Sequence, residues 1–285
     1  MIHYIENEYL KVGVKEFGSE LTSIVSKESN FEFLWQGNPD IWSGQSPVLF
    51  PIIGRLFDDS YALDGNVYSM PKHGFARKLP WKLHSKSNCE MSFILSENEE
   101  TLACYPYCFK LILTFSLEGK KLIVKHEVIN KNDCTMYFSL GAHPAFNCEI
   151  GDTLVFEENE TLDCIKIDLE RSLRIPETTP LLRNEKEITV TKDVFNEDAL
   201  IFKGAVSENI TLKSKSSERE IKFNLGKAPY LGIWAKPGAP YVCIEPWYGV
   251  NDSTEKKADF SEKDEIQKLD AKESFLFTWS AEFAE

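Results

Sequence analysis

Hydrophobic and polar residues alternate along much of the chain, which is the pattern of half-buried β-strands. Between residues 109 and 117 every second side chain is apolar, and most of the others are polar. A Glu-Gly-Lys turn follows at residues 118–120, and a second alternating run covers residues 122–128. Together these segments predict a β-hairpin.

Similar short runs recur, most of them separated by turn residues such as Asp-Gly, Pro-Gly or Lys-Ser-Ser. They cover residues 91–95, 135–140, 209–213, 220–225, 230–235, 241–245 and 275–280. Helical periodicity is nearly absent. The best helix candidates are short segments at residues 39–44 and 192–198, and residues 255–269 indicate a surface loop or weak turn.

The chain has 19 Phe, 10 Tyr and 6 Trp residues, which suits sheet faces that pack against one another. At 285 residues it is long enough to bury a sizeable core without disulfides or a structural metal. No internal repeat divides it, and no linker rich in Gly, Ser or Pro is present. We therefore predict an all-β protein, a single large antiparallel β-sandwich that occupies residues 1–285 as one domain.

The net charge of −13 disfavours a nucleic acid or an anionic membrane as partner, because both attract basic surfaces. The sequence has no run of 18 apolar residues, and its first residues lack the features of a signal peptide. The seven cysteines are scattered and odd in number, which indicates free thiols in a reducing compartment. We expect a cytoplasmic protein, either a monomer or a homodimer.

Metal-binding motifs are incomplete in this chain. Cys104 and Cys108 have no second Cys or His pair at zinc spacing, and His126 has Asn130 where a HExxH motif needs histidine. The sequence contains no phosphate-binding loop, dinucleotide fingerprint or serine nucleophile elbow. We expect no metal and no cofactor.

Two short segments place one acid–base side chain among glycine, proline and aromatic residues. His143, in GAHPAFN, follows a predicted strand, where it would either face a cleft or bond a loop carbonyl. Glu245, in CIEPWYG, ends an apolar run, so partial burial would raise its pKa and make it a base near neutrality. The alternative for Glu245 is a structural pair with an arginine. Trp247 offers an apolar plate for the C–H face of a sugar.

Two further segments lie upstream. Arg55, in PIIGRLFDD, follows apolar residues and a glycine, where its guanidinium would reach two hydroxyl groups. His73, in PKHGFARKLPW, stands beside a glycine and an aromatic residue. Taken singly, each residue suits a structural role as well as a functional one. A His, a Glu and an Arg that converge would move a proton between two oxygens of a small polar ligand, and sugar ring opening is such a reaction.

These segments, in this order, resemble the aldose 1-epimerase (galactose mutarotase) family, and especially its LacX-like bacterial branch. The resemblance runs from ENEYLKVGVKEFGSEL through FLWQGNPDIW, SPVLFPIIGRL, HGFAR, GAHPAFN and CIEPWYG to SFLFTWS. It implies a β-supersandwich of the galactose mutarotase type.

The resemblance also implies roles for individual residues. In the family, the Glu at the position of Glu245 takes the proton from the anomeric hydroxyl. The His at the position of His143 donates a proton to the ring oxygen, and the one at His73 assists by hydrogen bonding. The Arg matching Arg55 binds sugar hydroxyls, and Asp198, in NEDALIF, is the candidate for the family's binding aspartate.

The activity we expect is that of an aldose 1-epimerase, which interconverts the α and β anomers of an aldohexose in carbohydrate metabolism. One alternative is a hexose-6-phosphate mutarotase, because HGFAR is similar to a motif of that group and Arg77, with Lys72 or Lys78, would hold the phosphate. Another is a non-catalytic carbohydrate-binding or sensing protein on the same scaffold. GAHPAFN also differs from the N-H-x-Y-F-N-L motif of galactose-specific members. A glycoside hydrolase or lyase would need two carboxylates, and only Glu245 has a suitable context.

Overall fold

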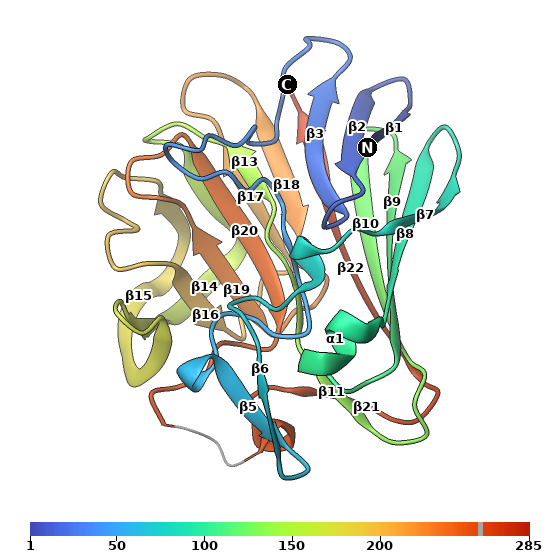
Figure 1. Ribbon diagram of the computed structural model, residues 1–285. Helices are drawn as coiled ribbons and strands as arrows, with labels where there is room; N and C mark the ends of the chain where they lie inside the picture. The colour runs from blue at the N-terminus through green and yellow to red at the C-terminus, as the bar shows by residue number, and fades with distance from the viewer. Residues whose placement is uncertain (256–258) are drawn as a thin grey trace.

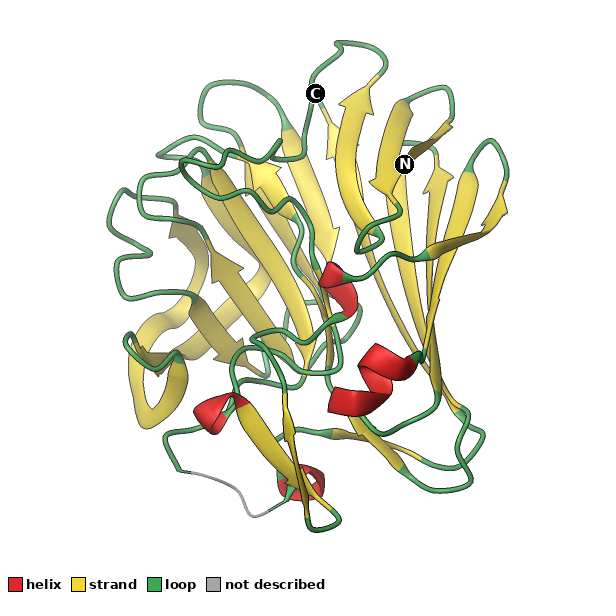
Figure 2. Cartoon of the chain, viewed as in Figure 1, coloured by secondary structure: helices red, strands yellow, loops and turns green. Residues whose placement is uncertain are grey.

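The chain folds into an almost entirely β structure (Figure 2). The computed structural model describes residues 1–255 and 259–285. Within these ranges, most strands belong to one 15-stranded sheet, and three others form a smaller sheet. The ladders of both sheets are antiparallel. The predicted fold class, an all-β antiparallel sandwich, is confirmed.

Most strands of the large sheet are labelled in Figure 1. In pairing order its strands are β4 (Val48–Leu49), β12 (Leu140–Ala142), β20 (Tyr241–Tyr248), β19 (Tyr230–Trp234), β16 (Leu200–Lys203), β14 (Thr153–Asp168), β17 (Asn209–Lys213), β18 (Glu220–Asn224), β22 (Ser274–Ala284), β10 (Lys121–Asn130), β9 (Phe109–Glu118), β8 (Glu90–Ser96) and β7 (Lys82–Lys86). Two further strands branch from it, since β13 (Ala145–Asn147) pairs with β20 and β15 (Leu173–Thr189) pairs with β14.

The remaining elements are short and lie around the large sheet. They are the three-stranded sheet β1 (Ile2–Glu6), β2 (Leu10–Lys15) and β3 (Glu20–Ser26), the hairpin β5 (Ser60–Leu63) and β6 (Asn66–Ser69), the pair β11 (Met136–Phe138) and β21 (Gln267–Leu269), the helix α1 (Glu99–Cys104), and 3₁₀ turns at Phe57–Asp59, Ala76–Lys78 and Phe260–Glu262. In Figure 1, α1 and the β5–β6 hairpin lie at the lower end of the view and both termini at the upper end. Among the described residues, no helix combines the length and hydrophobicity needed to cross a bilayer.

The helix α1 begins with a capping box. The Asn98 side chain accepts a hydrogen bond from the Thr101 N–H, and the Thr101 hydroxyl accepts one from the Asn98 N–H. This reciprocal pair satisfies two backbone donors that a helix start leaves free. The helix ends at Cys104, and the following residue, Tyr105, is extended. Tyr105 precedes Pro106, and the residue before a proline is disfavoured in helix.

One large hydrophobic cluster fills the interior and takes side chains from nearly every element. The alternation seen in the sequence becomes alternation of burial: in β9 every second residue is buried. Phe50 is fully buried, and its ring centre lies 5.2 Å from that of Phe109 and 6.0 Å from that of Phe138. Phe223 of β18 stacks on Trp279 of β22 at 5.1 Å. Buried aromatic rings of this kind supply much of the apolar area removed from water.

The predicted hairpin is confirmed as β9 and β10, and the predicted strands around residues 91–95, 209–213, 220–225, 230–235, 241–245 and 275–280 are confirmed as β8, β17, β18, β19, β20 and β22. Residues 135–140 contribute to two strands, β11 and β12. The helix candidates at residues 39–44 and 192–198 are wrong, because both segments are turns without a helix. In the segment 255–269, residues 256–258 lie outside the described residues, and the rest contains a 3₁₀ turn and β21.

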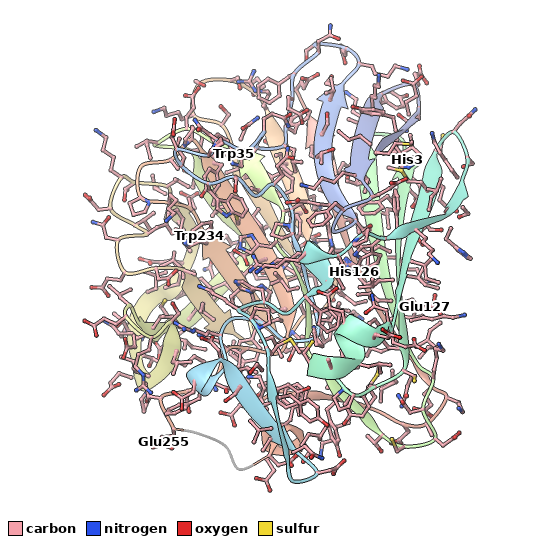
Figure 3. The ribbon with its side chains drawn as sticks, in the orientation of Figure 1. His3, Trp35, His126, Glu127, Trp234 and Glu255 are labelled. Atoms are coloured by element: carbon pink, nitrogen blue, oxygen red, sulfur yellow. The ribbon has the colours of Figure 1, made fainter. Side chains whose placement is uncertain are left out.

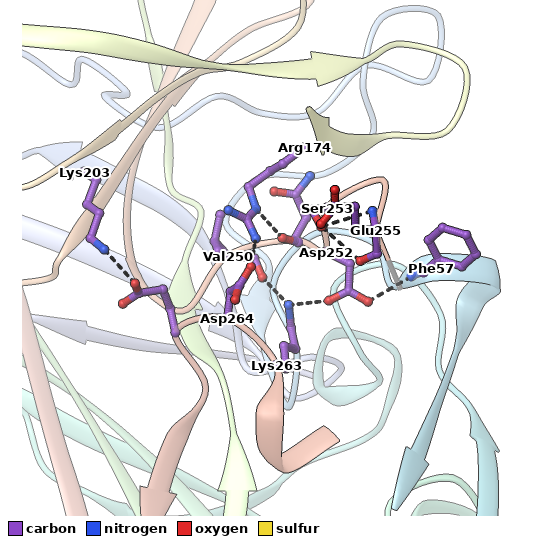
Figure 4. Close-up of polar contacts among 11 residues, drawn as sticks. Phe57, Arg174, Lys203, Val250, Asp252, Ser253, Glu255, Lys263 and Asp264 are labelled. Carbon is purple, nitrogen blue, oxygen red and sulfur yellow. Dashed lines mark hydrogen bonds and ion pairs between the residues drawn. The ribbon is translucent and has the colours of Figure 1, made fainter. Parts of the chain in front are cut away.

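A buried ion pair fixes the segment that follows β20. Lys263 is buried, and its Nζ donates to the carbonyl oxygen of Val250 at 2.6 Å and to Oδ1 of Asp252 at 2.7 Å (Figure 4). The other carboxylate oxygen of Asp252 accepts from the Phe57 N–H at 3.0 Å. Burial lowers the pKa of Lys263, and the Asp252 carboxylate opposes that shift. The ammonium therefore depends on Asp252 for compensation of its lost hydration.

Arg174, in β15, holds the same segment from the opposite side (Figure 4). Its Nε donates to the carbonyl oxygen of Asn251 at 2.7 Å, and its Nη2 donates to Asp264 at 2.8 Å. The backbone N–H of Arg174 also donates to the carbonyl oxygen of Asp252 at 2.8 Å. One buried cation, Lys263, and one half-buried cation, Arg174, thus fix the path of the chain between β20 and the following loop.

Replacing Asp252 with alanine should leave the Lys263 ammonium buried without its counter-ion. We expect Asp252→Ala to lower the free energy of unfolding by about 3–5 kcal/mol, as for other broken buried pairs. Chemical denaturation measures this value. The control is Asp163→Ala, which breaks the half-exposed pair of Asp163 with Arg183 and should cost at most about 1 kcal/mol. Equal losses in the two variants would show that the Lys263 pair is not a buried support.

Candidate active site

The four segments that contain Arg55, His73, His143 and Glu245 meet at one cavity of about 240 Å³. This volume lies below the usual range of pockets for drug-sized ligands and suits a small molecule. From those segments the lining takes Gly54, Lys72, His73, Arg77, His143, Glu245 and Trp247. The other lining residues include Trp42, Ser172, Asp198, Trp234 and Asn251.

Strand register brings His143 and Glu245 together. Gly141 of β12 pairs with Trp247 of β20, and Ala145 of β13 pairs with Cys243, so the same register on both sides sets His143 opposite Glu245. Directly opposed residues on an antiparallel pair have neighbouring side chains. The Nε2 atom of His143 lies 3.3 Å from Oε1 of Glu245.

Aromatic side chains enclose this pair. Trp42 stacks on the His143 ring, with centroids 5.2 Å apart and planes at 28°, and Trp234 meets the same ring edge-on at 5.7 Å and 79°. Trp247 packs closely over two glycines: a Cβ would stand 2.8 Å from its indole at Gly141 and 2.6 Å at Gly232. The glycines of these segments therefore make room for an indole at the cavity wall.

Burial shifts the pKa values of Glu245 and His143 in opposite directions. Burial raises the pKa of Glu245 well above its ordinary value, and the nearby indole of Trp247 opposes part of that shift. Burial lowers the pKa of His143 to about 3. Both shifts have the same cause, which is that the charged form of each group loses hydration. Burial therefore favours the neutral form of each side chain, the carboxylic acid and the neutral imidazole.

His73 stands beside the pair in a backbone conformation that is fixed by its neighbours. Its ring centre lies 6.0 Å from that of His143, and its Nδ1 accepts a hydrogen bond from the Gly54 N–H at 3.1 Å. This bond assigns the ring proton to Nε2. His73 has φ +65° and Gly74 has φ +70°, and a Cβ on Gly74 would lie 2.2 Å from the carbonyl oxygen of Phe50. Burial is also the main cause that lowers the pKa of His73, so this ring is a neutral hydrogen-bond donor.

Two basic side chains, Lys72 and Arg77, line the same cavity. Arg77 is half-buried, and its Nη2 donates to the carbonyl oxygen of Lys72 at 2.8 Å. Its Nε has no hydrogen-bond partner in the described part of the chain. Burial lowers the pKa of Arg77 while the Glu20 carboxylate opposes this. Lys78 is exposed and is not part of the lining.

The structure also locates the other predicted binding residues. Asp198 lines the cavity with φ +74°, and its Oδ1 accepts from the Ala199 N–H at 2.8 Å. Arg55 does not line it. Its Nε and Nη2 donate to the two carboxylate oxygens of Asp59 at 2.7 and 2.5 Å. The structure thus pairs the guanidinium with Asp59 outside the cavity lining, and its contact with a sugar stays a prediction.

His126, whose zinc motif is incomplete, lies in the core rather than at the site. It belongs to β10 and is labelled in Figure 3. It is buried, and its Nε2 accepts a hydrogen bond from the indole Nε1 of Trp279 at 3.3 Å. Burial lowers its pKa to about 3.

One group of potential metal ligands lies at the site. Among the residues described, His143, Cys243 and Glu245 offer ligand atoms that lie within 4.8 Å of one another. Cys243 is fully buried, and burial raises the pKa of its thiol well above the ordinary value. A thiol that stays protonated is a poor metal ligand, so these residues fit proton transfer better than metal binding.

The residues of the cavity wall that the sequence interpretation missed include Trp42, Trp234 and Asn251. Trp42 is in a loop with Pro39 and Gly44, and Trp234 ends the buried strand β19. Aromatic residues next to such turns were the available signal. Nothing in the sequence around Asn251 marks its position.

Comparison with known proteins gives the family. A family model described as aldose 1-epimerase matches residues 1–266. The chromosomal LacX protein of Lactococcus lactis subsp. lactis is 32% identical over 281 residues, which are 93% of each chain. A protein of Escherichia coli K12, whose assigned name proposes a glucose-6-phosphate 1-epimerase, is 23% identical over 231 residues and covers 72% of this chain and 74% of its own.

Solved structures agree with these matches. A galactose mutarotase related enzyme from Lactobacillus acidophilus superposes with a TM-score of 0.94 at 30% identity, covering 100% of this chain and 98% of that one. A galactose mutarotase-like protein from Lactobacillus casei gives 0.94 at 29% identity, with both chains covered completely. The fold is therefore that of galactose mutarotase-like proteins, as the resemblance implied, and the chain belongs to the aldose 1-epimerase family.

Proposed function

We propose that this protein interconverts the α and β anomers of an aldohexose by acid–base opening and closure of the sugar ring. The observation that carries the proposal is the contact of His143 with Glu245, 3.3 Å apart at the wall of a small cavity. Mutarotation needs one group that removes the proton of the anomeric hydroxyl and one that protonates the ring oxygen. This pair supplies both.

The proposed steps balance as follows. Glu245 takes the O1 proton while His143 gives a proton to the ring oxygen; the C1–O5 bond breaks and the C1–O1 carbonyl forms. Rotation about C1–C2 turns the other face of the aldehyde to O5, and the same two groups return the protons as the ring closes. The Nε2–H of His73 would hydrogen-bond the ring oxygen and stabilise the charge that develops there.

The burial of the pair fits this cycle. Burial favours the neutral pair, in which the proton is on Glu245, and transfer of that proton to His143 over the 3.3 Å contact would give the carboxylate base and the imidazolium acid. Sugar hydroxyls at the pair would favour this ion pair, because they solvate both charges. The indoles of Trp42, Trp234 and Trp247 would contact the apolar C–H face of the ring.

A second candidate substrate is a hexose 6-phosphate. Lys72 and Arg77 line the cavity together with the acid–base pair, and the E. coli relative carries a name of that kind. A guanidinium with a free N–H suits a phosphate oxygen. A non-catalytic sugar-binding protein is the remaining alternative; its weakness is that binding alone does not require an acid opposite a base.

Glu245→Gln should lower the anomerisation rate by roughly 10²–10⁴-fold, because it removes the general base and keeps the side-chain shape. NMR exchange between the two anomeric signals measures the rate. Glu118→Gln, at an exposed position of β9, is the matched control and should match the wild type. A Glu245→Gln protein with nearly full activity would remove Glu245 from the mechanism.

The anomerisation rate should be almost independent of pH across the range in which Glu245 and His143 share one dissociable proton. It should fall in acid as a second proton binds near the depressed pKa of His143, about 3, and fall in base as Glu245 loses its proton above its ordinary range. The limits belong to the coupled pair rather than to either residue. The test is the enzymatic rate against pH after subtraction of the spontaneous rate. A single transition at the ordinary histidine value, about 6.5, would contradict the assignment.

Arg77→Ala separates the two substrate classes. If hexose phosphates are substrates, the apparent KM for glucose 6-phosphate should rise by roughly ten- to a hundredfold, the equivalent of losing a hydrogen bond to a charged group, while that for glucose barely changes. Lys78→Ala, an equal change of charge at the adjacent exposed position, is the control. A phosphate preference that survives Arg77→Ala would exclude this pocket as the phosphate site.

A further inference from the structure

Asn251 is a buried side chain at the cavity whose acceptor atom is unused. The residue is 6% exposed and lines the cavity. Its Oδ1 has no hydrogen-bond partner within the described residues. A buried amide oxygen without a partner costs free energy, so a ligand that supplies a donor would be stabilised at this position.

The orientation of this amide is set by a neighbour. Its Nδ2 donates to the carbonyl oxygen of Ser172 at 3.1 Å. A flipped amide would turn Oδ1 towards that carbonyl, and two acceptors would face each other. The unpartnered atom is therefore the oxygen, and the group that it takes from a ligand is a donor such as a hydroxyl.

The backbone on both sides of Asn251 is fixed. The carbonyl oxygen of Asn251 accepts from Arg174 Nε at 2.7 Å, and that of Val250 accepts from the buried Lys263 at 2.6 Å. The next residue, Asp252, completes the ion pair with Lys263 at 2.7 Å. These contacts, drawn in Figure 4, hold the backbone that carries the amide in one place, which reduces the entropy that ligand binding would otherwise lose.

Gly54 connects Asn251 to the catalytic side of the cavity. A Cβ on Gly54 would lie 2.1 Å from the Cβ of Asn251, so only glycine allows the two segments to approach. The N–H of the same Gly54 donates to Nδ1 of His73. Asn251 and His73 thus flank one glycine, beside the proposed ring-opening centre.

We propose that Asn251 is a substrate-binding residue whose Oδ1 accepts a hydrogen bond from a sugar hydroxyl other than the anomeric one. The inference rests on the proposed function, because it takes the ligand to be an aldose. The Lys263–Asp252 pair and Arg174 act as positioning residues for this contact.

Sugar binding tests this contact without relying on turnover. It is measured by the change in tryptophan fluorescence, because three of the six tryptophans line the cavity. The ligands are glucose, galactose and the 2-, 3-, 4- and 6-deoxy derivatives of glucose. Asn251→Ala should raise the Kd for glucose by about three- to tenfold, the range of one net hydrogen bond. One deoxy sugar should bind the wild type and Asn251→Ala equally, because it lacks the hydroxyl that Oδ1 accepts. Asn159→Ala, at an exposed position, is the matched control, and thermal melting checks that each variant is folded.

The outcomes separate the inference from the function on which it rests. If wild-type protein binds glucose and Asn251→Ala changes no Kd, or weakens all deoxy sugars by the same factor, the contact is overturned while the proposed function stands. If wild-type protein binds none of these sugars and exchanges no anomers, the proposed function fails and the inference fails with it. Loss of the effect for a single deoxy sugar supports the contact and identifies the hydroxyl.

Discussion

The contact between His143 and Glu245 depends on strand register more than on any local feature. Gly141 and Ala145 hold the same register against β20, and the residue midway between them is the histidine that faces Glu245. A shift of one residue would turn Glu245 to the other face of the sheet. The register of the sheet therefore sets the distance between His143 Nε2 and Glu245 Oε1, which is 3.3 Å.

Burial sets the protonation preferences of the two side chains in that contact. In water a carboxylic acid and an imidazole would each titrate near its usual pKa, but here desolvation moves the two pKa values in opposite directions. The neutral form of each side chain is then favoured over a wider pH range than in water. The indole rings that exclude water from His143 are also surfaces on which a pyranose would lie. In the proposed mechanism, one set of side chains would thus provide both the proton balance and the binding surface.

A large part of this arrangement could be predicted from the sequence. Period-two alternation located the hairpin of β9 and β10, and strand ends rich in Gly, Pro and aromatics marked His143 and Glu245. The long hairpin of β14 and β15 was missed, because exposed polar residues on both faces hide its alternation. That residues 1–285 form one domain, and that the protein is a monomer or homodimer, stay predictions.

Two residues show where local pattern stops being informative. Arg55 lies in the expected motif, but its guanidinium forms an ion pair with Asp59, four residues later. Asp59 has a left-handed backbone conformation with φ +51°. Asn251 had no motif, and its orientation is set by the carbonyl of Ser172, 79 residues away in the chain. Both outcomes depend on tertiary contacts that no short segment encodes.

The most direct test of the account is NMR magnetisation exchange between the α and β anomers of glucose and of galactose with wild-type protein. No metal or cofactor would be added. We predict that, for at least one of these sugars, the exchange rate rises in proportion to protein concentration and far exceeds the spontaneous rate. Exchange that stays at the spontaneous rate for both sugars, and for glucose 6-phosphate, would contradict the claim that the buried pair is a catalyst.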